Sequence, residues 1–194
     1  MIFSEAVAEV VAITKRPDKE VEIKSNLNKA ITFFVLKDTF QNDLVDTSLP
    51  IDPLRLGQTI DISMSTPPLL RIRKFDYIRP RGQRYCLEEI KPEQLFTPKG
   101  YIQPNRYYLA GNNLTFTLSV PDSFLEVGYF VYPPVLTPVT GSDTHWLLDN
   151  IPWAVIEWAA SQTFQSIGDD ASARYYQASA MVLFNTMKND ISQP

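Results

Sequence analysis

The hydrophobic pattern of the chain is helical at both ends and changes in the middle. Between Trp146 and Ile191, apolar residues recur at helical spacing on either side of Gly168. The first stripe consists of Ile156, Ala160, Phe164 and Ile167, and the second of Tyr176, Ala180, Leu183, Phe184, Met187 and Ile191. This spacing predicts two long helices, and their short connection predicts that they lie roughly antiparallel.

The residues around these two helices predict where they begin and end. Asp149 and Asn150 are expected to cap the first helix, and Gly168 is expected at its C-terminal end. Asp169 and Asp170 then supply a cap and a negative first turn for the second helix. The same two acids could bind a cation, but capping explains them without one.

The N-terminal region predicts a second pair of helices. Its first stripe consists of Phe3, Val7, Val10 and Val11, and its second of Ile23, Leu27, Ala30, Ile31 and Phe34. Lys15, Arg16 and Pro17 separate the two stripes. A short amphipathic helix, a break and a longer helix are therefore expected.

The middle of the chain has a different composition. Twelve of the 15 prolines lie between Pro50 and Pro138, a density that helix interiors do not tolerate. The expected strands are Thr59 to Ser63, Leu69 to Tyr77, Arg84 to Glu89, Arg106 to Ala110, Leu114 to Ser119 and Gly128 to Tyr132. Gly111, Asn112 and Asn113 predict a hairpin turn between two of them, and residues 91–96 (KPEQLF) predict one helical turn.

This order of elements predicts an α+β fold rather than an alternating βαβ fold. We expect the N-terminal helix pair (1–40) and the C-terminal helical hairpin and tail (143–194) to form one helical bundle. The proline-rich segment 41–142 would then be an inserted antiparallel β region. The alternative is two independent helix pairs joined by a β domain.

Composition and charge narrow the class of protein. The chain has 194 residues, 44% hydrophobic and 21% charged, which is typical of a globular protein. Its net charge of −4 argues against general nucleic-acid binding. The single cysteine, Cys86, allows no intrachain disulfide or thiolate metal cage, and it favours a reducing compartment. No apolar run is long enough for a membrane span.

Few residues suggest catalysis. His145 is the only histidine, and no serine lies in a nucleophile motif, so a packing or loop role is expected for His145. Glu88 and Glu89 are adjacent, so on a strand they point to opposite faces. No cofactor or metal site is expected from the remaining acids and the isolated glycines. We therefore do not expect an enzyme.

One basic cluster and an excess of tyrosines suggest contacts with other molecules. The cluster consists of Arg71, Arg73, Lys74, Arg79, Arg81 and Arg84. It is either a solvated strand face or a positive patch for an acidic partner or DNA, and the net negative charge favours a protein partner. The aromatic residues that crowd the β segment are Tyr101, Tyr107, Tyr108, Tyr129, Phe130 and Tyr132. Any of them left on the surface would favour an interface.

Two stretches carry a resemblance to a known family. Residues 3–34 (FSEAVAEVVAITKRPDKEVEIKSNLNKAITFF) contain a short helix, a KRPD break and a second helix. Residues 146–189 contain WLLDNIPWAVIEWAA before the turn at Gly168. In these features the chain resembles the head-to-tail adaptor proteins of tailed bacteriophages, also called head-completion or connector proteins. The resemblance covers both ends and hardly touches the middle.

The resemblance implies a structural virion protein at the head–tail junction, made in the cytoplasm of the bacterial host. About a dozen copies would form a ring beneath the portal protein, extend the DNA channel and present a platform for the tail. Tail partners would be nozzle or tail-tube components, and DNA would pass without sequence-specific binding. The implied portal contact is the C-terminal segment, with Met181, Phe184, Lys188, Ile191 and Pro194. The basic cluster would face neighbouring subunits or the next tail component.

Two other classes of function stay open at this stage. The first is a carbohydrate- or protein-binding module in which the aromatic-rich β segment forms the site. The second is an enzyme with paired carboxylates, such as a glycosidase, but the sequence offers no obvious pair of acids.

Overall fold

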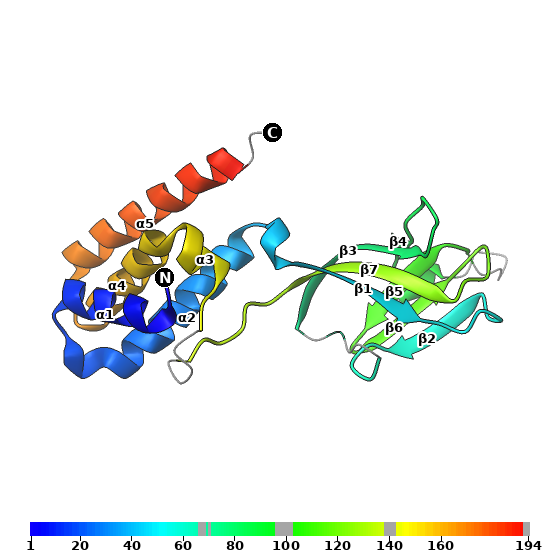
Figure 1. Ribbon diagram of the computed structural model, residues 1–194, viewed down its shortest axis with the longest axis horizontal. Helices are drawn as coiled ribbons and strands as arrows, with labels where there is room; N and C mark the ends of the chain where they lie inside the picture. Colours follow the sequence, from blue (N-terminus) through cyan, green and yellow to red (C-terminus); the bar gives the residue numbers. More distant parts are fainter. Residues whose placement is uncertain (66–68, 70, 96–102, 138–142, 192–194) are drawn as a thin grey trace. The chain divides into compact units, whose positions relative to one another are not determined.

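The computed structural model describes residues 1–65, 69, 71–95, 103–137 and 143–191, with the backbone alone for 189–191 (Figure 1). The chain divides into two compact units. One contains Met1–Asn42 and Pro133–Pro194 and is helical, and the other contains Asp43–Tyr132 and is built from strands. The prediction of an α+β protein is confirmed.

The helical unit has helices from both ends of the chain. They are α1 (Phe3–Thr14), the 3-10 turn η1 (Pro17–Lys19), α2 (Glu20–Lys37), α3 (Trp146–Asn150), α4 (Pro152–Ser166) and α5 (Asp170–Ile191), and a further 3-10 turn, η2 (Gln41–Asp43), follows α2. Lys15 ends α1 in the left-handed region at φ 54°, and Pro17 opens η1. The predicted break between the first two helices is therefore present.

Helix α4 is the centre of the helical unit. It packs against α1, α2, α3 and α5 (Figure 1). Its buried positions include three alanines, which let neighbouring helices approach closely. Aromatic rings fill the space near α5, where Phe34 stacks on Phe184 with centroids 4.7 Å apart. Helices from both chain ends thus share one hydrophobic core.

The ends of the C-terminal helices differ in part from the sequence prediction. Asp149 and Asn150 do not cap α4, because they lie inside the short helix α3. Asp149 instead accepts hydrogen bonds from the Met1 amino group and from Thr144 Oγ1, each at 3.1 Å. Gly168 adopts φ 81° after α4, and the Asp169 carboxylate accepts from the Ser172 N–H at 3.1 Å. The predictions for these last two residues are confirmed.

The β unit has two sheets rather than one. Sheet A has the order β1-β7-β3, with strands β1 (Leu44–Pro50), β7 (Phe124–Val131) and β3 (Ile72–Pro80). Sheet B has the order β2-β6-β5-β4, with strands β2 (Gly57–Asp61), β6 (Asn113–Thr117), β5 (Arg106–Ala110) and β4 (Glu88–Glu89). The purely antiparallel prediction is wrong at one point, because β4 pairs with β5 in parallel.

The two sheets enclose a second hydrophobic core. Leu114, Phe116 and Leu118 alternate into it as predicted, and all three are buried. The hairpin prediction is confirmed, because Ala110 pairs with Asn113 across Gly111, which has φ 61°. The predicted helical turn at 91–96 is also present in its described part, as the 3-10 helix Pro92–Gln94, and Phe96 lies outside the described residues.

The central strand of sheet A contains a glycine for a steric reason. Gly128 lies opposite Tyr77 of β3, and a Cβ atom at Gly128 would overlap the Tyr77 ring. Two register shifts also interrupt β3. The tyrosine ring therefore lies directly on the backbone of β7, which only glycine allows.

Candidate interaction surfaces

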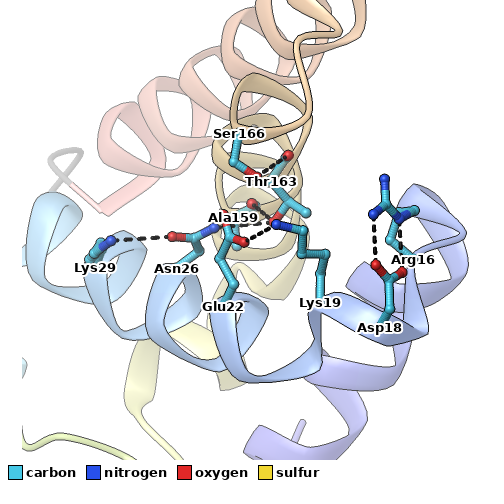
Figure 2. Close-up of polar contacts among 9 residues, drawn as sticks. All are labelled: Arg16, Asp18, Lys19, Glu22, Asn26, Lys29, Ala159, Thr163 and Ser166. Atoms are coloured by element: carbon cyan, nitrogen blue, oxygen red, sulfur yellow. Dashed lines mark hydrogen bonds and ion pairs between the residues drawn. The ribbon is translucent and has the colours of Figure 1, made fainter.

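A buried polar seam joins α2 to α4 (Figure 2). Asn26 Nδ2 donates a hydrogen bond to Thr163 Oγ1 at 3.2 Å, and both side chains are buried. Thr163 Oγ1 donates to the Ala159 carbonyl at 3.0 Å, and Lys29 Nζ lies 3.4 Å from Asn26 Oδ1. Because the seam is packed between helices and its polar atoms have partners, it fixes how α2 lies on α4.

The outer end of the seam carries charged pairs. The Ser166 hydroxyl and Lys19 lower the pKa of Glu22, and Lys19 Nζ lies 2.9 Å from its carboxylate. Arg16 binds Asp18 through two hydrogen bonds and lowers the pKa of Asp18 to about 2 (Figure 2). These pairs stabilise the turn between α1 and α2, and we interpret the seam as structural.

The inner face of α5 holds two of the residues proposed to contact the portal. Phe184 is buried between Phe34 and Phe40, and Met181 is partly buried, with its sulfur 3.9 Å from Lys37 Nζ. A partner could reach Phe184 only by displacing α5 from this core.

The last turn of α5 is more accessible. Lys188 forms an ion pair with Asp38, and half of the Lys188 side chain stays exposed. Ile191 ends α5, and its side chain lies outside the described atoms, as does the whole of Pro194.

The outer face of α5 is exposed but has little charge. Its side chains from Ala171 to Thr186 include Tyr175, which is 69% exposed, and Val182, which is 64% exposed. The 13 residues from Tyr175 to Met187 contain no charged side chain. A surface helix normally carries charged and polar residues on its outer face, so this face is unusual.

The outer face of α2 has a similar character. Val21 is 83% exposed and Leu36 is 50% exposed, and only Lys29 carries a charge between Ser25 and Leu36. A groove of about 600 Å³ follows this face and is completed by Val135. We call this surface the α2 outer face.

A local hydrogen-bond clamp holds Val135 in this groove. Asn28 Nδ2 donates to the Leu136 carbonyl at 3.0 Å, and Asn28 Oδ1 accepts from the Leu136 N–H at 2.8 Å. The paired bonds fix the backbone beside Val135, which is 72% exposed. The exposed apolar side chain is therefore held in place.

The basic cluster of the sequence is only partly brought together. Arg79 lies on the outer face of sheet A, where its Nε donates to Glu126 Oε2 at 2.6 Å. Beside it, Tyr77 donates to Asp46 Oδ1 at 2.7 Å, a bond that raises the pKa of Tyr77 to about 12. These pairs surround a hollow of about 420 Å³. Acids therefore compensate the charge here.

The other members of the cluster lie along the same strand or in the adjoining turns. The guanidinium of Arg73 lies 5.5 Å from the centre of the Phe130 ring, and that of Arg81 lies 5.3 Å from the Phe124 ring. Lys74, Arg71 and Arg84 are exposed. The sequence signal thus combines residues with different surroundings rather than one basic patch.

The tyrosines of the β unit contribute mainly to packing. Tyr107 and Tyr129 are buried against Phe75, and burial raises the pKa of Tyr107 to about 12. Tyr108 is half-buried and Tyr132 is 41% exposed, whereas Tyr101 lies outside the described residues. These positions do not form an aromatic binding face.

His145 has a structural position. It is buried as the N-cap of α3, where its Nδ1 accepts a hydrogen bond from the Leu147 N–H at 3.3 Å. Burial lowers the pKa of His145 to about 4, so the ring is neutral at pH 7. The interpretation of His145 as a packing residue agrees with this geometry.

The described residues contain no group of three or more His, Cys, Asp or Glu side chains that could hold a metal ion. No helix in this part of the chain has both the length and the apolar character needed to cross a membrane. Sequence reasoning missed the outer faces of α2 and α5, although the uncharged run from Tyr175 to Met187 was a visible signal for one of them.

Comparison with known proteins found no match to this chain, either among protein families or among curated proteins.

Proposed function

We propose that this protein is a head-to-tail adaptor of a tailed bacteriophage. As a structural virion protein, it would form a ring beneath the portal, extend the DNA channel and provide the platform for the tail. The observation that carries this proposal is the outer face of α5, where Tyr175 and Val182 are exposed within a run of 13 uncharged residues. Exposed apolar faces of this kind are typical of protein contacts.

The division into a helical unit and a β unit supports the proposal. We take the helices from both chain ends as the adaptor bundle, because they share one core built around α4. The β unit, Asp43–Tyr132, is then the insertion between them. An assembly protein of this kind needs repeated surfaces rather than a reactive site.

We assign the proposed portal and tail contacts to different surfaces. The portal would bind the end of α5, from Lys188 to the C-terminus, because Met181 and Phe184 are engaged in the core. The tail component would bind the basic cluster region of the β unit, whose exposed members include Lys74 and Arg84. DNA would pass through the ring without sequence-specific contacts.

Native mass spectrometry tests the proposal most directly. The chain would be measured alone and after mixing with portal rings from the same source. We expect portal rings to acquire many copies of the chain. Portal rings that acquire no copies would overturn the proposal.

A truncation tests the assigned portal contact. Removal of residues 189–194 should leave the helical unit folded, because every buried side chain among the described residues of this unit lies at or before Met187. We expect weaker portal binding at an unchanged circular dichroism spectrum. A matched variant with the Ser4→Ala substitution, at an exposed position of α1, should retain portal binding. Normal binding by the truncated chain would refute the assignment of the C-terminal end.

A further inference from the structure

We infer that the outer face of α5 in one copy docks antiparallel onto the α2 outer face of the neighbouring copy. This inference rests on the proposed function, because it names the surfaces that would join the copies of the ring. Both faces belong to the helical unit and are exposed. The exposed charged side chains within these spans are Arg174 on α5 and Lys29 on α2.

The two faces match in length. On α5 the face extends from Ala171 to Thr186, and on α2 it extends from Val21 to Leu36. Each span covers the same number of residues and therefore about 22 Å of helix at 1.5 Å per residue. Neither helix would leave part of the opposing face uncovered.

Charges at the helix ends select the antiparallel orientation. In a parallel arrangement, Glu20 would lie beside Asp170, and Lys37 would lie beside Lys188. In the antiparallel arrangement, Glu20 lies near Lys188, which also pairs with Asp38 of its own chain, and Lys37 lies near Asp170. The helix dipoles favour the same orientation, because each positive end then lies beside a negative end.

The same register places large side chains opposite smaller ones. When Lys37 is opposite Asp170, Glu20 is opposite Met187, next to Lys188. The facing pairs are then Val21 with Thr186, Ser25 with Val182, Lys29 with Ala178, Thr32 with Tyr175, and Leu36 with Ala171. In four of these five pairs a bulkier residue meets a smaller partner, and Val21 and Thr186 are of similar size. Alternation of this kind lets two helices approach closely and interdigitate.

The contact would be head-to-tail rather than symmetric. Helix α4 packs against both α2 and α5, and the polar seam holds α2 in place. The angle between the two faces is therefore fixed inside each copy. Because the two faces differ, every docked pair leaves one face of each kind free, so copies can continue until a ring closes.

Cysteine crosslinking tests this pairing in the full chain. The natural Cys86 is exposed and would first be replaced by Ser. Ser25→Cys and Val182→Cys would then be made in separate chains, mixed, oxidised mildly and separated on a non-reducing gel. We expect about tenfold more disulfide-linked dimer in the mixture than in either chain alone, because docking raises the effective concentration of the two thiols. One chain with both cysteines should give a ladder of oligomers.

A control separates docking from random collision. Ser4→Cys places a thiol at an exposed position of α1, outside both faces. Mixed with the Val182→Cys chain, it should give only background dimer. Circular dichroism melting would confirm that each variant is folded. A Ser25–Val182 heterodimer no stronger than this background, or equally strong crosslinking of the Val182→Cys chain with itself, would overturn the inference.

The same variants distinguish this inference from the proposed function. Crosslinking would be repeated on portal-bound chain. Portal rings that carry the chain without the Ser25–Val182 crosslink would overturn the inference and leave the adaptor function standing. A crosslink in a chain that ignores the portal would overturn the adaptor function and retain the contact between copies.

Discussion

The outer face of sheet A and the outer face of α5 differ in whether their side chains form polar pairs. On sheet A of the β unit, Arg79 pairs with Glu126, and Tyr77 pairs with Asp46. On the helical unit, the outer face of α5 has no such pairs to offer between Tyr175 and Met187, because the sequence there has no charge. On sheet A these polar side chains find partners within the same chain, whereas the outer face of α5 exposes apolar side chains.

This difference indicates where assembly energy can come from. Docking on the sheet face would first require partly exposed ion pairs to lose water and exchange partners, which gives little net free energy. Docking on α5 would remove apolar side chains such as Val182 from water, which is favourable in proportion to the buried area. We therefore place the proposed contacts between copies on the helical unit.

The largest expected effect separates the inner and outer faces of α5. Phe184→Ala removes a buried ring that stacks on Phe34, so it should destabilise the helical unit by about 3–5 kcal/mol. Val182→Ala, on the exposed face of the same helix, should change stability by less than about 0.5 kcal/mol. Urea unfolding followed by circular dichroism measures both values.

The two variants also test whether the units unfold separately. If they do, Phe184→Ala should shift the helical transition and leave the transition of the β unit in place. Equal losses of unfolding free energy for Phe184→Ala and Val182→Ala would show that α5 has no distinct buried and exposed faces.

The second effect concerns stability at low pH. We expect the helical unit to lose more stability than the β unit as the pH falls, because it contains His145. The pKa of His145 falls from 6.5 to about 4 on folding, chiefly because the ring is buried. Between these pH values the unfolded chain binds a proton that the folded chain does not, so stability falls as pH decreases. The His145 contribution to this loss should reach about 2–3 kcal/mol at pH 4.

A non-titrating variant isolates the contribution of His145 to the pH dependence of stability. His145→Asn keeps a side chain suited to an N-cap but removes the titrating ring. Urea unfolding at pH 7 and at pH 4.5 should show a smaller loss of helical-unit stability in this variant than in the natural chain. An identical pH dependence in the two proteins would contradict the buried, neutral His145.

The third effect concerns the β unit, where Gly128 leaves room for the Tyr77 ring on the outer face of sheet A. Gly128→Ala would push a methyl group into the Tyr77 ring and should cost about 1–3 kcal/mol. The double variant Gly128→Ala with Tyr77→Ala removes the obstacle, so the glycine substitution should cost much less in that background. Additive losses in this double-mutant cycle would show that the two residues do not compete for space.

The sequence predicted the helices well because their apolar spacing is regular over many turns. It missed β1, since Asp46, Thr47 and Ser48 interrupt the apolar pattern and Pro50 ends the strand. It also started β7 too late, at Gly128, whereas the strand begins at Phe124. Only the structure shows that this glycine admits the Tyr77 ring.

The candidate surfaces were less predictable than the fold. The basic cluster was visible in the sequence, but the partners of Arg79 and Arg73 come from strand β7, distant in sequence. Phe184 was proposed as a portal contact, yet its burial depends on Phe34 from the other end of the chain. Contacts between distant segments decide which side of a helix is exposed, and periodicity alone does not supply them.

The smallest expected effect concerns the sheet face itself. Arg79 and Glu126 form an ion pair whose arginine side chain is 42% exposed, and solvent-exposed pairs contribute little to stability. Replacing both residues by Ala should therefore leave the stability of the β unit nearly unchanged, as urea unfolding would measure. Because the pair is satisfied within its own chain, association of copies should also be unchanged in native mass spectra. Loss of association in this double variant, with the fold intact, would place the contact between copies on sheet A and reverse the contrast between the two units.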